Sequence, residues 1–72
     1  MSDQIELEPG DYSVVVKRRD LGDAPWRWEI WVAGRSRPVE RSERPFASMA
    51  QASREGKAAL RALLAKQFTT AA

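Results

Sequence analysis

The sequence predicts an α+β domain in which a three-stranded antiparallel sheet is covered on one face by a single C-terminal helix, in the order β-β-β-α. Two observations predict it. Between residues 12 and 42, apolar and polar side chains alternate in short stretches, which is the period of half-buried strands. Residues 48–67 instead carry apolar side chains every three or four positions, as in a helix packed on one side.

A leader of eleven residues with a net charge of −4 comes first, and its acids are Asp3, Glu6, Glu8 and Asp11. Ile5 and Leu7 alternate with glutamates as in a short strand, and the following Pro-Gly-Asp is a turn signal. We expect residues 1–11 to be flexible or to form this strand, residues 12–68 to form one domain, and residues 69–72 to fray.

Three strands are predicted within the domain. Residues 12–19 are β-branched and alternating, and residues 26–33 give the strongest signal, with three tryptophans. The pair Gly34-Arg35 fits a two-residue hairpin turn, which predicts the third strand over residues 36–42. Because Pro38 cannot donate a ladder hydrogen bond, this third strand belongs at a sheet edge.

The hairpin also predicts which residues of the last two strands face each other. The predicted pairs are Ile30 with Val39 and Trp28 with Arg41 on the covered face, and Trp31 with Pro38 and Glu29 with Glu40 on the open face. On the covered face we expect Trp26 and Trp28 in the core, with Arg41 across a ring as a cation–π contact. Glu29 opposite Glu40 is unfavourable and counts against nucleic-acid binding by the open face.

Ser48 is predicted to cap the helix, because Gln51 follows it at the spacing of a capping box, and the helix is expected to end near Gln67. Its apolar stripe consists of Met49, Ala52, Ser53, Gly56, Leu60, Leu63 and Leu64. Gly56 costs about 1 kcal/mol in a helix relative to Ala. We expect it there because the helix approaches a large ring such as Trp28 closely.

Composition excludes several kinds of site. The chain has no Cys and no His, which removes disulfides and thiolate or imidazole chemistry, and we expect no cofactor, no metal and no catalytic residue. No apolar run approaches the ~20 residues of a membrane span, so we expect a cytoplasmic protein without a membrane partner. Beyond residue 11 the net charge is +6, and most of the cations are Arg, which favours an anionic partner.

Two surfaces are candidates for binding. On the open face, Trp31 with Arg27 and Pro38 is a candidate partner contact, and the structural alternative is that Trp31 stacks on Pro38 or under the leader. Cations on one helix flank and at the hairpin tip are candidate nucleic-acid contacts, and the alternative is an ordinary solvated flank. These cations are Arg35, Arg37, Arg54, Lys57 and Arg61.

One stretch of the chain resembles a known family, through Gly34, Val39, Ser42-Glu43, Phe46, Ser48, Gly56 and Leu60. These positions resemble the YegP-like group of small bacterial domains, with its Trp-bearing strand, Gly turn and Gly-containing helix. The order of elements is also similar to that of AP2/integrase DNA-binding domains and HicB-like antitoxin domains. The YegP-like resemblance implies a domain often found as tandem copies, so that a single copy dimerises.

The sequence therefore favours a non-catalytic binding or assembly domain that acts through a homodimer or another protein, with no small-molecule substrate. Its alternative function is nucleic-acid binding through the helix flank and the hairpin tip.

Overall fold

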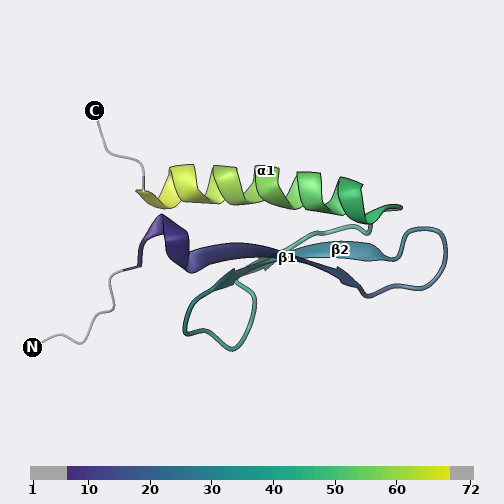
Figure 1. The fold of residues 1–72 in the computed structure, drawn as a ribbon, viewed down its shortest axis with the longest axis horizontal. Coiled ribbons are helices and arrows are strands. Elements are labelled where there is room, and N and C mark those ends of the chain that lie inside the picture. The colour runs from purple at the N-terminus through teal and green to yellow at the C-terminus, as the bar shows by residue number, and fades with distance from the viewer. Residues whose placement is uncertain (1–6, 69–72) are drawn as a thin grey trace, which may run out of the picture.

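The structure, a computed structural model that describes residues 7–68, has a three-stranded antiparallel sheet with one helix along one face (Figure 1). The elements are a 3-10 turn η1 (Pro9–Asp11), strands β1 (Tyr12–Arg18), β2 (Trp26–Val32) and β3 (Glu40–Arg41), and helix α1 (Met49–Phe68). The sheet order is β1-β2-β3, so β2 is central. The predicted α+β class and the β-β-β-α order are confirmed.

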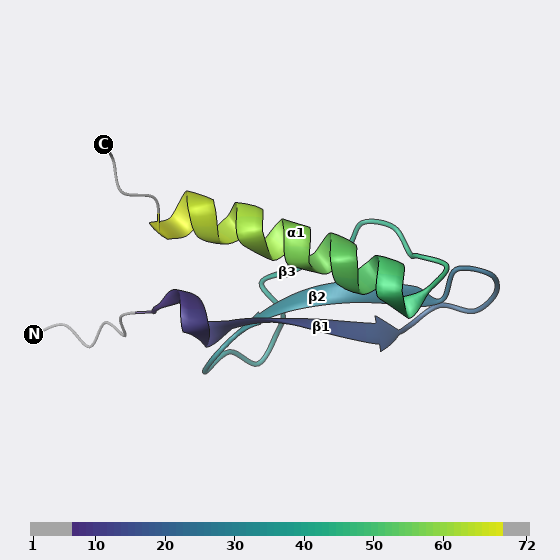
Figure 2. The same ribbon diagram turned by 45° about the horizontal axis from the view of Figure 1, so that its top comes forward.

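The layers are simple. Figures 1 and 2 show α1 lying along β1 and β2 on one side of the sheet, and the loop between β2 and β3 leaving it on the other side. Strands β1 and β2 pair along their whole length, with Val14 opposite Ile30 and Val16 opposite Trp28. The predicted strands over residues 12–19 and 26–33 therefore form nearly as expected.

The pairing of β2 with β3 differs from the prediction. Glu29 lies opposite Arg41 and Ile30 opposite Glu40, which is one residue away from the predicted register. The predicted two-residue hairpin does not form, because the N–H of Arg35 donates to the carbonyl of Val32 and Gly34 with φ +86° is the third residue of a four-residue turn.

A longer loop follows, so β3 comprises only Glu40 and Arg41 and not residues 36–42. Pro38 lies in that loop, outside any strand. The edge is prolonged by Ser42, whose N–H donates to the carbonyl of Trp28 (2.9 Å), and by mutual hydrogen bonds between Trp26 and Phe46. Ser42 and Phe46 are farther apart in the sequence than Trp28 and Trp26, the β2 residues to which they bond. The additional residues of the edge include Pro45, which has no N–H to donate.

The core lies between the sheet and α1. It consists of Trp28, Ile30, Phe46 and Ala52, and Trp26 packs against it while remaining half-buried. The predicted close approach at Gly56 is confirmed, because a Cβ placed there would lie 2.8 Å from Cβ of Trp28 and 2.8 Å from Cγ1 of Val14. Gly56 therefore sets the distance between helix and sheet.

Both ends of α1 are tied down. The hydroxyl of Ser48 accepts a hydrogen bond from the N–H of Gln51 (3.0 Å), which confirms the predicted cap. At the other end the rings of Phe68 and Tyr12 form a T-shaped contact, with 5.8 Å between ring centroids. Within residues 7–68, α1 is too polar to be a membrane-crossing helix.

The leader is only partly described. Ile5 lies outside the described residues, as do residues 69–72, and Leu7 precedes η1 without belonging to a strand. The predicted Pro-Gly-Asp turn is η1, in which a carboxylate oxygen of Asp11 accepts a hydrogen bond from the N–H of Glu8 (2.8 Å).

Candidate functional site

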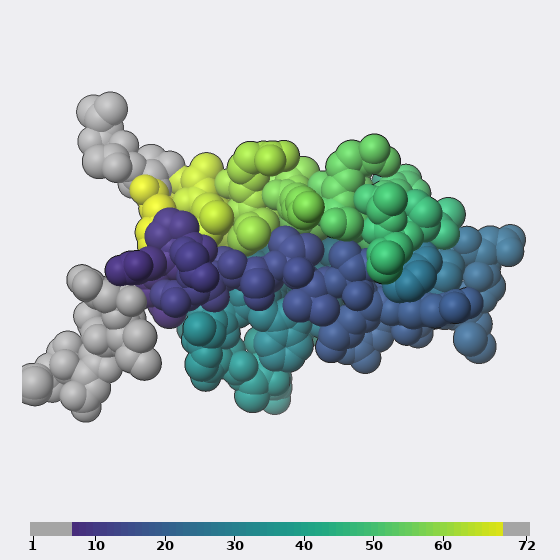
Figure 3. Space-filling model, viewed as in Figure 1, coloured from purple at the N-terminus to yellow at the C-terminus, as the bar shows by residue number. Residues whose placement is uncertain are grey.

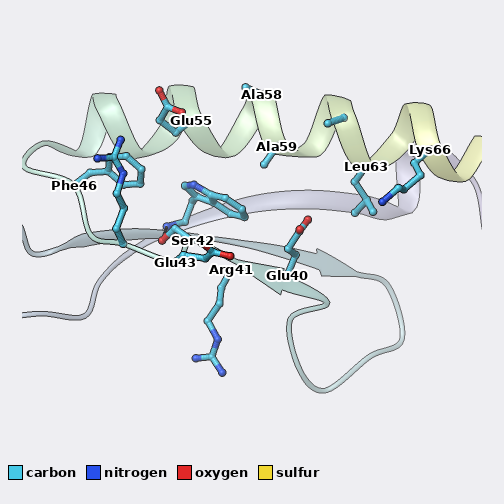
Figure 4. A pocket seen from close by; sticks show the side chains of 13 residues that line it. Glu40, Arg41, Ser42, Glu43, Phe46, Glu55, Ala58, Ala59, Leu63 and Lys66 are labelled. Carbon is cyan, nitrogen blue, oxygen red and sulfur yellow. Dashed lines mark hydrogen bonds between the residues drawn. The ribbon is translucent and has the colours of Figure 1, made fainter.

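The open face of the sheet, on the side away from α1, gathers most of the polar contacts. Alternation along the strands places Lys17 of β1, Arg27, Glu29 and Trp31 of β2, and Arg41 of β3 on this face. Figure 4 shows the side chain of Arg41 pointing away from α1, whereas Glu40 points toward it. The expected contact of Arg41 across a core tryptophan is therefore wrong, because the one-residue change of register moved it to the other face.

Glu29 is the centre of this face and is only 3% exposed. One carboxylate oxygen accepts a hydrogen bond from the indole Nε1 of Trp31 (2.9 Å) and lies 3.6 Å from Nζ of Lys17. The other accepts from Nη2 of Arg19 (3.2 Å). Burial raises the pKa of Glu29, but the hydrogen bond from Trp31 and the charges of Lys17 and Arg19 outweigh it, so the pKa is lowered and the group is ionised at neutral pH.

Trp31 is held within this arrangement. Its side chain is half-buried, its N–H is bound to Glu29, and the ammonium of Lys17 lies 5.5 Å from the ring centroid. Lys17 is a residue that the structure places over the ring. Trp31 therefore orients two charged groups instead of presenting a free indole.

Arg27 connects three segments. Its Nε donates to the carboxylate of Asp20 (2.6 Å) in the β1–β2 loop, and its Nη1 donates to the carbonyl of Ser42 (3.0 Å). The N–H of Trp28 donates to the hydroxyl of the same Ser42 (3.3 Å). Arg27, predicted as a partner contact, thus holds the edge after β3 in position.

A pocket opens on this face where the loop of residues 33–39 leaves the sheet. Figure 3 shows that loop standing out from the body below β1. The lining residues are Arg19, Asp20, Arg27, Glu29, Arg37, Pro38 and Arg41. Arg37 and Arg41 are exposed, and within residues 7–68 neither forms an ion pair. The cations of this pocket therefore outnumber its acids.

The structure does not bring the predicted nucleic-acid contacts together. Arg35 and Arg37 lie in the loop on the open side of the sheet, whereas Arg54, Lys57 and Arg61 are exposed on α1, on the other side. Sequence reasoning missed Lys17, Arg19 and Arg41 as their neighbours. The alternation of β1 carried a signal for Lys17 and Arg19, but Arg41 required the correct register.

A second pocket lies between α1 and the β3 edge (Figure 4). Trp28, Phe46 and Leu63 form its floor, while Ala58 and Ala62 line its helix wall. Both acidic and basic side chains line this pocket. In residues 7–68 no three Asp or Glu side chains gather as a metal ion would require.

Comparison with protein-family models, with curated proteins and with solved structures gives no match. The resemblance to the YegP-like group therefore stays a prediction.

Proposed function

We propose that the chain is a non-catalytic binding domain and that the open face of its sheet binds the phosphate backbone of a nucleic acid. The observation that carries this proposal is the pairing of Glu29 with Arg41. In the register expected from the sequence, Glu29 and Glu40 would face a phosphate chain together. In the observed register Glu40 lies on the covered face, and Arg41 takes its place.

The acids that remain on the face are already neutralised. Glu29 is buried and bonded to Arg19 and Trp31 with Lys17 nearby, and Asp20 is paired with Arg27. Arg37 and Arg41 are left with exposed guanidinium groups. Such groups match the two oxygens of a phosphate with parallel N–H bonds, so this pair is the expected anion contact.

The placement of Trp31 supports backbone recognition rather than base recognition. An indole that stacks on a base must offer a free ring face. Here the ring is half-buried, its N–H is bonded to Glu29 and Lys17 lies over one ring face, so the ring holds that ammonium at the surface. Binding is therefore expected to depend on charge and to differ little between sequences.

The test compares two double variants that each remove two positive charges. Fluorescence anisotropy of labelled single-stranded and duplex oligonucleotides at ~50 mM salt measures affinity where electrostatic binding is strongest. Arg37→Ala with Arg41→Ala should weaken binding uniformly across sequences and lower the slope of log affinity against log salt by about one unit per residue. Arg54→Ala with Arg61→Ala, on α1, is the matched control and should have the smaller effect.

Two outcomes contradict the proposal. If neither single-stranded nor duplex DNA or RNA binds at low salt, the chain does not act through nucleic acid. If the α1 double variant loses more affinity than the loop and β3 double variant, the helix flank is the binding surface.

A further inference from the structure

The two edges of the sheet are built differently. On one edge β3 has only two residues and follows a loop that contains Pro38. On the other edge β1 has seven residues, Tyr-Ser-Val-Val-Val-Lys-Arg, without Pro or Gly. Short strands and Pro prevent an edge from pairing with another chain, whereas a long β-branched strand favours such pairing.

The hydrogen bonds to β2 show which groups of β1 point outward. The N–H of Ala33 donates to Asp11, and the N–H of Arg19 donates to Pro25, so the odd-numbered residues of β1 are bonded to β2. The even-numbered residues Val14, Val16 and Arg18 therefore direct N–H and C=O away from the sheet.

Tyr12 is also an even-numbered residue of β1, but only one of its two main-chain groups can pair with another strand. Its N–H already donates to the carbonyl of Pro9, so only its carbonyl is available. Among residues 7–68, the outward groups of Val14 and Val16 have no main-chain partner. The main-chain groups of β1 that can pair with another strand therefore run from the carbonyl of Tyr12 to the N–H of Arg18.

We infer that two copies of the chain associate through their β1 edges and continue the sheet, antiparallel, across a two-fold axis at Val15. Val14 then pairs with Val16 of the second copy, and the carbonyl of Tyr12 accepts from Arg18 of the second copy. This pairing is self-complementary, as a two-fold interface requires.

Charge and the bonded N–H of Tyr12 disfavour the two registers in which the axis moves by two residues. With Val15 on the axis, Lys17 faces Ser13 of the second copy, and no like charges are opposed. A slip that puts Lys17 on the axis would place two ammonium groups opposite each other, which is unfavourable. A slip toward the start of β1 would call on the N–H of Tyr12, which is already bonded.

The helix adds apolar surface beside this edge. Leu60 and Leu64 lie on the flank of α1 opposite Ala58 and Ala62, which line the β3-side pocket, so they are on the β1 side. Both are half-buried, and Leu64 does not belong to the core cluster. A second copy would cover them, which is the kind of support that a small domain without disulfide or metal commonly uses.

The experiment tests whether Val15 lies opposite Val15 of the second copy. Sedimentation velocity of the full chain at ~100 µM should show a dimer, since association follows mass action. Val15→Lys and Val15→Glu should each sediment as monomers, because like charges meet on the axis. An equimolar mixture of the two should restore a dimer, which a general loss of folding could not do.

Ser13 supplies variants at an exposed position. Ser13→Lys opposes Lys17 of the second copy and should weaken the dimer about fivefold, whereas Ser13→Glu should strengthen it about fivefold. Trp31→Ala serves as the control for an open-face dimer and should leave association unchanged. A monomeric wild type, a dimer that persists in Val15→Lys, or a dimer lost only in Trp31→Ala overturns the inference.

Discussion

Replacing Gly56 with Ala tests how α1 and the sheet set their separation. In most helices this change stabilises the protein by about 1 kcal/mol. Here the new Cβ would lie 2.8 Å from Cβ of Trp28 and from Cγ1 of Val14. Carbon atoms pack best at about 3.5–4.0 Å, so the layers must separate by roughly 0.7 Å at this point.

The expected result follows from two opposing terms. Overpacking a well-packed contact costs about 1–3 kcal/mol, and the better helix propensity of Ala returns about 1 kcal/mol. The net effect is a loss of about 0–2 kcal/mol in the free energy of unfolding, or about 5 °C in Tm per kcal/mol lost. Gly56→Leu adds more volume at the same place and should be less stable than Gly56→Ala.

The assay is urea unfolding followed by tryptophan fluorescence, since Trp28 lies at the contact. Ala62→Gly, at an exposed position of the same helix, is the control and should lose about 1 kcal/mol through propensity alone. If Gly56→Ala gains as much stability as Ala62→Gly loses, the contact imposes no steric cost, and the reasoning is refuted.

Two further predictions concern single hydrogen-bonded groups. Ser48→Ala should lower the free energy of unfolding by about 1 kcal/mol, because the hydroxyl caps α1, while Ser36→Ala in an exposed loop should change it little; equal losses in urea unfolding would argue against the cap. Glu29→Gln tests the buried carboxylate, whose pKa is lowered below the ordinary glutamate value of 4.5. A carboxyl group whose pKa is lower in the folded than in the unfolded state stabilises the fold at pH values above its unfolded-state pKa. The wild type should therefore be more stable than Glu29→Gln at neutral pH, and this advantage should decline as the pH falls below 4.5. A stability difference that stays constant between about pH 3 and pH 7 would show that the ionised form of Glu29 has no role.

Much of the fold could be predicted from local patterns. Alternation located β1 and β2, the Ser48 cap located the start of α1, and the cost of a glycine inside a helix predicted the approach of Gly56 to Trp28. These features depend on residues that lie near one another in the sequence, or on one exceptional residue whose cost requires a reason.

The register of β3 could not be predicted in this way. It depends on a turn in which Gly34 occupies the third position, and on distant contacts of Ser42 and Phe46 with β2. A one-residue error exchanges the faces of neighbouring side chains, so Glu40 and Arg41 were assigned to the wrong sides. The candidate site was affected most, because its charge balance depends on this exchange.

The small number of hydrogen bonds that join β3 to the sheet also affects how readily this segment opens. The segment between Val32 and Phe46 is joined to β2 by a few main-chain bonds, including those from Val39 and Ser42, whereas β1, β2 and α1 share the core. Local opening of this segment leaves the rest folded, so the amide hydrogens of Val39 and Ser42 should exchange with solvent sooner than that of Val15 in the β1–β2 ladder. Since Arg37 and Arg41 belong to the segment, a bound polyanion would select its closed state and slow the exchange of these same amides.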